Sequence, residues 1–314
     1  MTRRVIFLTV LMFATAAMTM AAVDSALLAL VMPDAKVLSG VQVAQAESSP
    51  FGQYVLAKTQ IDDPKLQALM AMTGFDPRHD LREILAATSS ASTEAGLVLA
   101  RGAFQPAKFV SAATTSGGST TSHRGFTVIL PEANGQGAIA FLDNTIAVIG
   151  NLAAVQSAID RRFSGAVFSG PLAQKAQAVS NSNDAWFATL TPLSDFLAGK
   201  AANPTVNNAM QSDLLQAVQQ ASGGLTFGST AVTLHGEALT RSAQDAQSLS
   251  DVLKFLVAMM QNQGSAGSAV ANSAQFTVDG ATLRLTLSLP EQQAEQLFMP
   301  AAGPKTLKRK AAVR

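Results

Sequence analysis

Short apolar runs separated by two-residue turn formers constrain the fold of this chain more than any other feature of its sequence. Asn134-Gly135, Asp143-Asn144 and Asp279-Gly280 each lie between two such runs. Dipeptides of Asn, Asp and Gly favour the tight turns that join neighbouring antiparallel strands. The sequence therefore predicts antiparallel hairpins that build a sheet.

Helical patterns alternate with these strands. The longest covers residues 243–260, where apolar residues recur three or four positions apart. We expect helices over 51–56, 64–73, 77–81, 106–113, 152–162, 192–197, 209–220, 243–260 and 291–298, and small-residue loops over 114–122 and 264–269. Strands and helices in this mixture predict an α+β fold.

The expected elements follow a similar order in residues 34–163 and 183–298. Each part begins with a strand and helices, continues with a hairpin, a helix and a small-residue loop, and ends with strands and a helix. We infer two tandem related units, each a mainly antiparallel sheet with helices packed on one face. Residues 164–182 are expected to form a helical linker, and residues 299–314 a disordered basic tail.

Residues 1–25 have the composition of a secretion signal. Two arginines near the start are followed by an uncharged apolar stretch over residues 5–23 and then by small residues. Such a segment directs a chain out of the cytoplasm. We therefore expect an exported protein, located in the periplasm or outside the cell.

The cleavage point of this signal has two candidates. The triplet Val23-Asp24-Ser25 predicts cleavage before Ala26, and cleavage after Ala21 is the alternative. An uncleaved helix that anchors the chain in a membrane is a third possibility. The next apolar stretch, residues 26–32, stops at Pro33 and is expected to be extended and to pack on the first strand.

Composition excludes several classes of chemistry. The chain has no cysteine, which excludes disulfides, thiolate metal sites and cysteine nucleophiles. Of the net charge of +1, residues 305–314 contribute +5 and residues 1–25 contribute +1, so residues 26–304 carry −5. No aromatic residue is interleaved with the cations of the tail, and we expect no nucleic-acid partner.

The sequence carries no short catalytic signature. It contains no nucleophile elbow, S-x-x-K pair, H-E-x-x-H helix, P-loop or G-x-G-x-x-G loop. The three histidines, His79, His123 and His235, are far apart along the chain, and we expect neither a metal nor a cofactor. The leading hypothesis is a non-enzymatic protein that binds an unknown protein or an apolar small molecule. The alternatives are a hydrolase whose site assembles from distant residues and a structural envelope or adhesion component.

The most distinctive stretch of the chain is G-F-D-P-R-H-D-L-R, from Gly74 to Arg82. Gly74 suits the left-handed end of a helix, Asp76 the cap of the next helix, and Pro77 its first position. Most of the stretch is therefore explained by local structure. The residues in it that form a candidate binding surface are Phe75, Asp76, Arg78, His79, Asp80 and Arg82.

The charges of this stretch allow several ion pairs. Asp80 has Arg78, Arg82 and Arg101 as candidate partners.

The same stretch carries a resemblance. The string G-F-D-P-R-x-D-L, after P-D-A-K-V-x-x-G-V at residues 33–41, resembles a family of uncharacterised exported bacterial proteins. Leu97–Gly102 and Ala158–Arg162 are similar to later blocks of that family. The resemblance covers most of the expected mature chain. It implies export and brings no known activity, so no functional residue is transferred from it.

Overall fold

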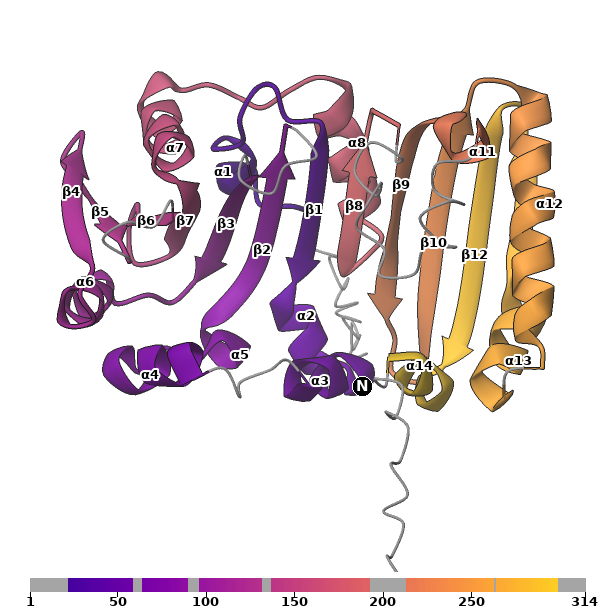
Figure 1. Cartoon of the computed structure of the whole chain (residues 1–314), viewed down its shortest axis with the longest axis horizontal. Helices are drawn as coiled ribbons and strands as arrows, with labels where there is room; N and C mark the ends of the chain where they lie inside the picture. Colours follow the sequence, from indigo (N-terminus) through magenta and orange to yellow (C-terminus); the bar gives the residue numbers. More distant parts are fainter. Residues whose placement is uncertain are drawn as a thin grey trace, which may run out of the picture.

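Twelve antiparallel strands form a single sheet. The computed structural model describes residues 22–58, 64–89, 96–131, 137–192, 213–262 and 264–298. Within these ranges the strands are β1 (Val37–Gln42), β2 (Leu81–Thr88), β3 (Gly96–Gly102), β4 (Ser119–His123), β5 (Phe126–Leu130), β6 (Gly137–Phe141), β7 (Ile146–Asn151), β8 (Ala185–Thr189), β9 (Val218–Phe227), β10 (Ala231–Thr240), β11 (Gln275–Asp279) and β12 (Thr282–Pro290). Their order is β11-β12-β10-β9-β8-β1-β2-β3-β7-β6-β5-β4, and the row of strands spans the molecule (Figure 1).

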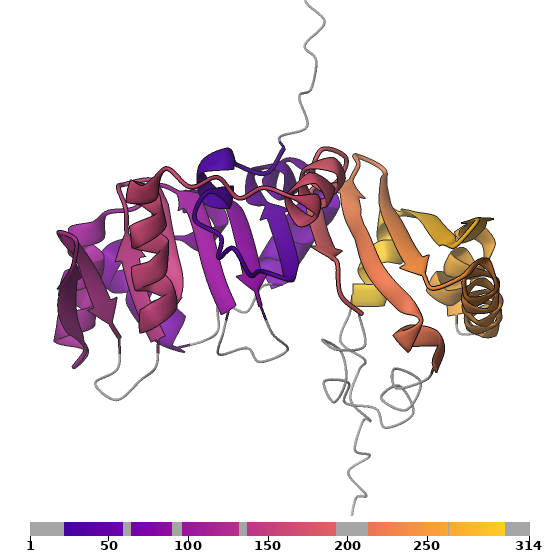
Figure 2. The same ribbon diagram turned by 90° about the horizontal axis from the view of Figure 1, so that it is seen from above.

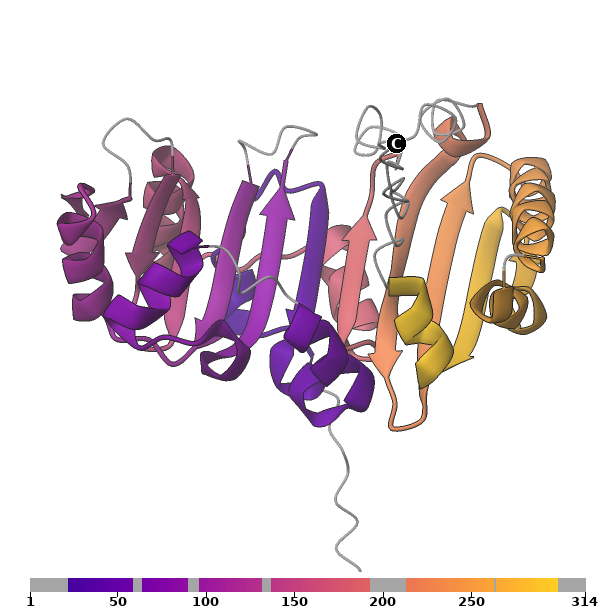
Figure 3. The same ribbon diagram turned by 60° about the horizontal axis from the view of Figure 1, so that its bottom comes forward.

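Helices lie on both faces of this sheet and along one of its edges (Figures 2 and 3). They are α1 (Ser25–Leu28), α2 (Val43–Ser48), α3 (Pro50–Lys58), α4 (Pro64–Thr73), α5 (Pro77–Asp80), α6 (Pro106–Thr115), α7 (Leu152–Ser164), α8 (Pro171–Ser180), α11 (Asp213–Gln216), α12 (Ala243–Met260), α13 (Gly264–Ser273) and α14 (Glu291–Phe298). None of these described helices combines the length and apolar character needed to cross a bilayer. The predicted α+β class with an antiparallel sheet is confirmed.

The two parts of the chain meet at the antiparallel pair of β1 and β8. Val37 pairs with Thr189 at one end and Val41 with Ala185 at the other. Trp186 is buried at this junction, and its ring lies over Gly40, where an added Cβ would be only 2.6 Å from the indole. Glycine at position 40 therefore makes room for the only tryptophan of the chain.

Helices pack on both faces of the first part of the sheet. Leu99 on β3 belongs to the core beneath α1, α7 and α8, whereas its neighbour Ala100 belongs to the core beneath α6. Successive strand residues point to opposite faces, so β3 is buried from both sides. The expectation that helices cover only one face is wrong here, because the alternating residues of β3 are apolar on both sides.

The second part of the sheet has one apolar and one polar face. Val232 and Leu289 pack under α13 and α14, and Leu283 packs under α12. The residues that alternate with them on β10 and β12 are mostly polar and at least partly exposed, and His235 and Arg284 are among the exposed ones. Both strands therefore follow the pattern of a sheet with one buried and one polar face.

Three local predictions are wrong. Residues 218–220 belong to β9 rather than to a helix over 209–220, because Ala221 pairs with Thr189 and extends the sheet from β8. Residues 264–269 begin the helix α13, in which Gly267 and Val270 are buried. The expected loop 114–122 contains β4, which pairs with β5.

The segment 26–32 packs on the sheet as expected, but its first part is the helix α1 rather than an extended strand. The side chain of Asp24 caps this helix by accepting a hydrogen bond from the Ala26 N–H. Residues 1–21, the Asn134-Gly135 turn, the predicted helix from 193 onward and the basic tail lie outside the described residues.

Candidate functional site

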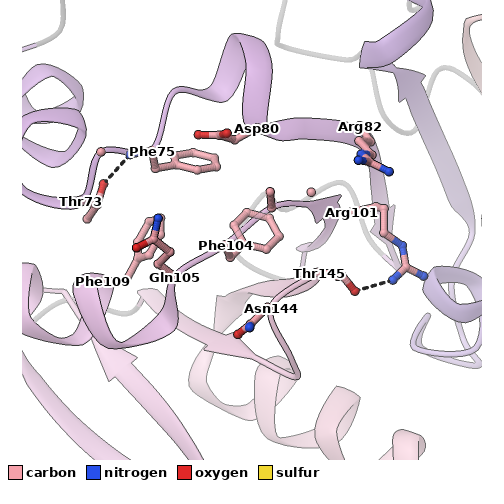
Figure 4. A pocket seen from close by; sticks show the side chains of 13 residues that line it. Thr73, Phe75, Asp80, Arg82, Arg101, Phe104, Gln105, Phe109, Asn144 and Thr145 are labelled. Atoms are coloured by element: carbon pink, nitrogen blue, oxygen red, sulfur yellow. Dashed lines mark hydrogen bonds between the residues drawn. The ribbon is translucent and has the colours of Figure 1, made fainter.

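A cavity of about 410 Å³ lies where β2 begins, β3 ends and β7 begins. We call it the Arg82 pocket. Its walls come from the α4–α5 connection, the ends of these strands and the start of α6 (Figure 4). It is lined by Thr73, Gly74, Phe75, Asp80, Arg82, Arg101, Gly102, Ala103, Phe104, Gln105, Phe109, Asn144 and Thr145.

The turn after α4 places Phe75 in the pocket. Thr73 Oγ1 donates to the carbonyl of Leu69 at 2.6 Å and accepts from the Phe75 N–H at 3.1 Å. Between them Gly74 has φ +72°, a backbone conformation that a side chain rarely adopts. The predicted left-handed helix end is therefore confirmed, and it turns Phe75 back toward the sheet.

Three phenylalanine rings form the apolar wall of the pocket. The ring of Phe75 lies 5.6 Å from that of Phe104 and 5.4 Å from that of Phe109, measured between centroids. Phe104 and Phe109 are 6% and 8% exposed, and both contact Phe141 behind them. Rings at these separations attract one another, which keeps the wall in place.

Backbone hydrogen bonds join the strand ends below the pocket. The Ala103 N–H donates to the carbonyl of Asp80 at 2.8 Å, and the Phe104 N–H donates to the carbonyl of Asn144 at 2.8 Å. Gly102 directly precedes these two donors and pairs with Leu81, and a Cβ there would be 2.4 Å from the Asp80 carbonyl oxygen. Glycine is thus required for the close approach of β3 to α5.

Two arginines form the opposite end of the pocket. Figure 4 shows Arg82 and Arg101 on the side away from Phe75 and Phe109. Arg101 is held by Asp24 and donates to Thr145 Oγ1 at 2.9 Å. Arg82 is exposed and makes no hydrogen bond or ion pair with any residue in the described part of the chain. A guanidinium binds anionic groups strongly through its paired N–H donors.

The N-terminal segment reaches this end of the pocket. Asp24 binds Arg101, and its backbone N–H donates to Glu83 Oε1 at 3.1 Å. Burial raises the pKa of the Glu83 carboxyl, since the charged form loses its hydration on the sheet face beneath α1. Val23 beside them is also buried, so residues 23–24 belong to the folded body.

The predicted binding-surface residues separate into two groups. Phe75, Asp80 and Arg82 line the pocket. Asp76 and Arg78 bind each other instead, at 2.6 Å between Oδ2 and Nη2.

The remaining member of the set, His79, is 74% exposed and lies 3.4 Å from Glu47. None of the three candidate ion pairs of Asp80 forms, because Asp80 Oδ2 accepts the Asp76 N–H at 2.7 Å and so caps its own turn. Arg101 pairs with Asp24 from a distant part of the sequence.

Sequence reasoning missed most of the apolar wall. Phe104 and Phe109 flank the Pro106 start of α6, and the pairing of β2 with β3, which sets Leu81 opposite Gly102, brings them to Phe75. The predicted turn at Asp143-Asn144 joins β6 to β7, but the place of Asn144 in the pocket follows from the pairing of β3 with β7. No local signal identifies these residues as neighbours of Arg82.

The three histidines lie in three different places. His79 is on α5, His123 on β4 is 2.9 Å from Asp160, and His235 is on β10. β4 is the edge strand of the first part of the sheet, and β10 lies in the second part. Among the described residues no group of three His, Asp or Glu side chains is arranged to hold a metal ion.

Comparison with known proteins identifies the fold alone. No protein-family model matches this chain, and no curated protein sequence matches it. Crystal form III of TP0453 is 12% identical, with a TM-score of 0.57 over 88% of this chain and 97% of that chain. Form IV is 12% identical, with a TM-score of 0.53 over 88% and 96%, and form I is 13% identical, with a TM-score of 0.50 over 88% and 97%. At this level of identity the likeness carries no residue-level function.

Proposed function

We propose that this chain is an exported, non-enzymatic protein that binds an amphipathic small molecule in the Arg82 pocket. One observation carries the proposal: Arg82 has no partner among the described residues and lies across the pocket from the wall of Phe75, Phe104 and Phe109. An apolar lining with a few convergent polar groups is the usual composition of a small-molecule site.

The phenyl rings and the Arg82 guanidinium together favour a ligand with one apolar end and one anionic end. An apolar group is stabilised when it leaves water and packs against the phenyl rings. A carboxylate is matched by the planar fork of the Arg82 guanidinium. Asp80 lies nearby but already accepts the Asp76 N–H, so it competes weakly for the arginine. We therefore propose a medium-chain carboxylic acid as the ligand class.

The positions of the histidines support this function over the hydrolase alternative. A nonlocal hydrolase site needs a nucleophile, a base and an orienting group within hydrogen-bond reach of one another. His79 and His123 each contact a different carboxylate, His235 is on β10, and none of the three lines the Arg82 pocket.

We also propose that the chain is exported and that its two parts arose by duplication of one unit. The signal-like residues 1–25 support export. From the centre of the sheet outward, the strand order β1-β2-β3-β7-β6 corresponds to β8-β9-β10-β12-β11, which supports an origin from two copies of one unit. In the described residues the first part has β4 and β5 in addition.

Calorimetry with decanoate tests the proposed ligand class. We expect saturable binding to the exported protein that weakens about tenfold in Arg82→Gln, since one charge-assisted contact is lost. Arg78→Gln is the matched control, because this arginine is bound to Asp76 and does not line the pocket. Absence of saturable binding, or an equal loss in both variants, would refute the proposal.

A further inference from the structure

A second cavity, of about 440 Å³, lies on the polar face of the sheet beside α8. It is separate from the Arg82 pocket, with which it shares no lining residue. We call it the Glu237 pocket. It is lined by Lys175, Ala178, Val179, Ser182, Asn183, Ser222, Gly223, His235, Gly236, Glu237, Arg284, Leu285 and Thr286.

One carboxylate holds two cations at this pocket. Glu237 Oε1 lies 3.2 Å from Lys175 Nζ, and Glu237 Oε2 lies 3.2 Å from Arg284 Nε. Burial by itself would raise the pKa of Glu237, but Lys175 and Arg284 outweigh it and hold the pKa below its usual value. The carboxylate is therefore charged at neutral pH, and it fixes the two cationic groups side by side.

The lining of the pocket keeps an excess of positive charge. Lys175 and Arg284 together carry two charges against the single charge of Glu237. Asp279 also contacts Arg284, at 3.6 Å, but it is largely exposed and does not line the pocket. One negative charge on a ligand would balance the lining, and the matching donors are the N–H groups of Lys175 and Arg284 that neither Glu237 nor Asp279 uses.

The rest of the lining is suited to hydroxyl groups. The His235 side chain on β10 is exposed and makes no hydrogen bond or ion pair with the described residues. Thr286 on β12 places its hydroxyl opposite His235, and Ser222 on β9 places its hydroxyl opposite Glu237. Asn183 is 4% exposed and donates to the carbonyl of Val179, while its Oδ1 accepts no hydrogen bond from the described residues. A buried acceptor of this kind is costly unless a donor reaches it.

We propose that the Glu237 pocket binds a small hydroxylated carboxylate. The carboxylate would lie between Lys175 and Arg284, and the hydroxyl groups would contact His235, Ser222 and Thr286.

Calorimetry with D-gluconate tests this site. We expect saturable binding that falls at least about tenfold in Arg284→Gln and in His235→Gln, two exposed positions where a polar substitution leaves the core intact. Sorbitol lacks the carboxylate and hexanoate lacks the hydroxyls, so neither is expected to bind here.

The same calorimetry distinguishes binding at the Glu237 pocket from binding at the Arg82 pocket. Arg82→Gln should leave gluconate binding unchanged, and Arg284→Gln should leave decanoate binding unchanged. Absence of gluconate binding, gluconate binding that both pocket variants retain, or equal binding of sorbitol would overturn the proposal.

Discussion

Oδ2 of Asp24 lies 2.7 Å from Nε and 2.6 Å from Nη2 of Arg101, which joins residues 77 positions apart in the sequence. Asp24 precedes α1, and Arg101 lies near the end of β3 at the Arg82 pocket. Both side chains are about three-quarters buried. The pair therefore fastens the N-terminal segment to the sheet.

Removal of this ion pair is expected to destabilise the fold. We expect Asp24→Ala to lower the free energy of unfolding by about 2–3 kcal/mol, because it removes both a charge-assisted pair and the cap of α1. Asp24→Ser keeps an oxygen that can accept the Ala26 N–H, so it should lose about 1 kcal/mol less. Urea unfolding measures both losses, and equal losses in Asp24→Ala and Asp24→Ser would mean that the cap of α1 contributes nothing.

The position of Asp24 also predicts where the signal is cleaved. Cleavage before Ala26 would remove the buried Val23 together with the Arg101 partner, whereas cleavage after Ala21 would leave both in place. We therefore expect the exported protein to begin at Ala22. Intact-mass measurement distinguishes the two ends and the uncleaved chain. A mature chain that begins at Ala26 and is as stable as one that begins at Ala22 would contradict this prediction.

Gly102 is expected to tolerate no side chain. In Gly102→Ala the new Cβ would lie 2.4 Å from the Asp80 carbonyl, so β3 and α5 must separate. We expect a loss of about 1–3 kcal/mol in the free energy of unfolding and weaker decanoate binding. Gly137→Ala is the control, because a Cβ at that strand position meets nothing within 4 Å. Thermal unfolding of the two variants tests the difference, and similar melting temperatures would contradict it.

Sequence reasoning succeeded where the determinants of structure are local. The turn of Gly74, the cap of Asp76 and the first position of Pro77 depend only on residues within a few positions, and all three were predicted. β9 was partly assigned to a helix because its pairing with β8 is a distant contact that no local pattern reports. The Arg82 pocket was half identified for the same reason: Phe75, Asp80 and Arg82 belong to one local stretch, whereas Phe104 and Asn144 reach it through strand pairing.

The Asp76–Arg78 pair predicts a titration at low pH. The hydrogen bonds from the Arg78 side chain lower the pKa of the Asp76 carboxyl from 3.8 to about 2. A lowered pKa in the folded state adds stability that is present above pH 3.8 and is lost as the pH falls through about 2. Asp76→Asn keeps the cap but cannot ionise, so the advantage of the natural protein should disappear over this interval. NMR titration of the Asp76 carboxyl carbon checks the pKa directly, and Arg78→Gln should return it toward 3.8. A midpoint near 3.8 in the natural protein, or one that Arg78→Gln leaves unchanged, would show that the pair does not control this charge.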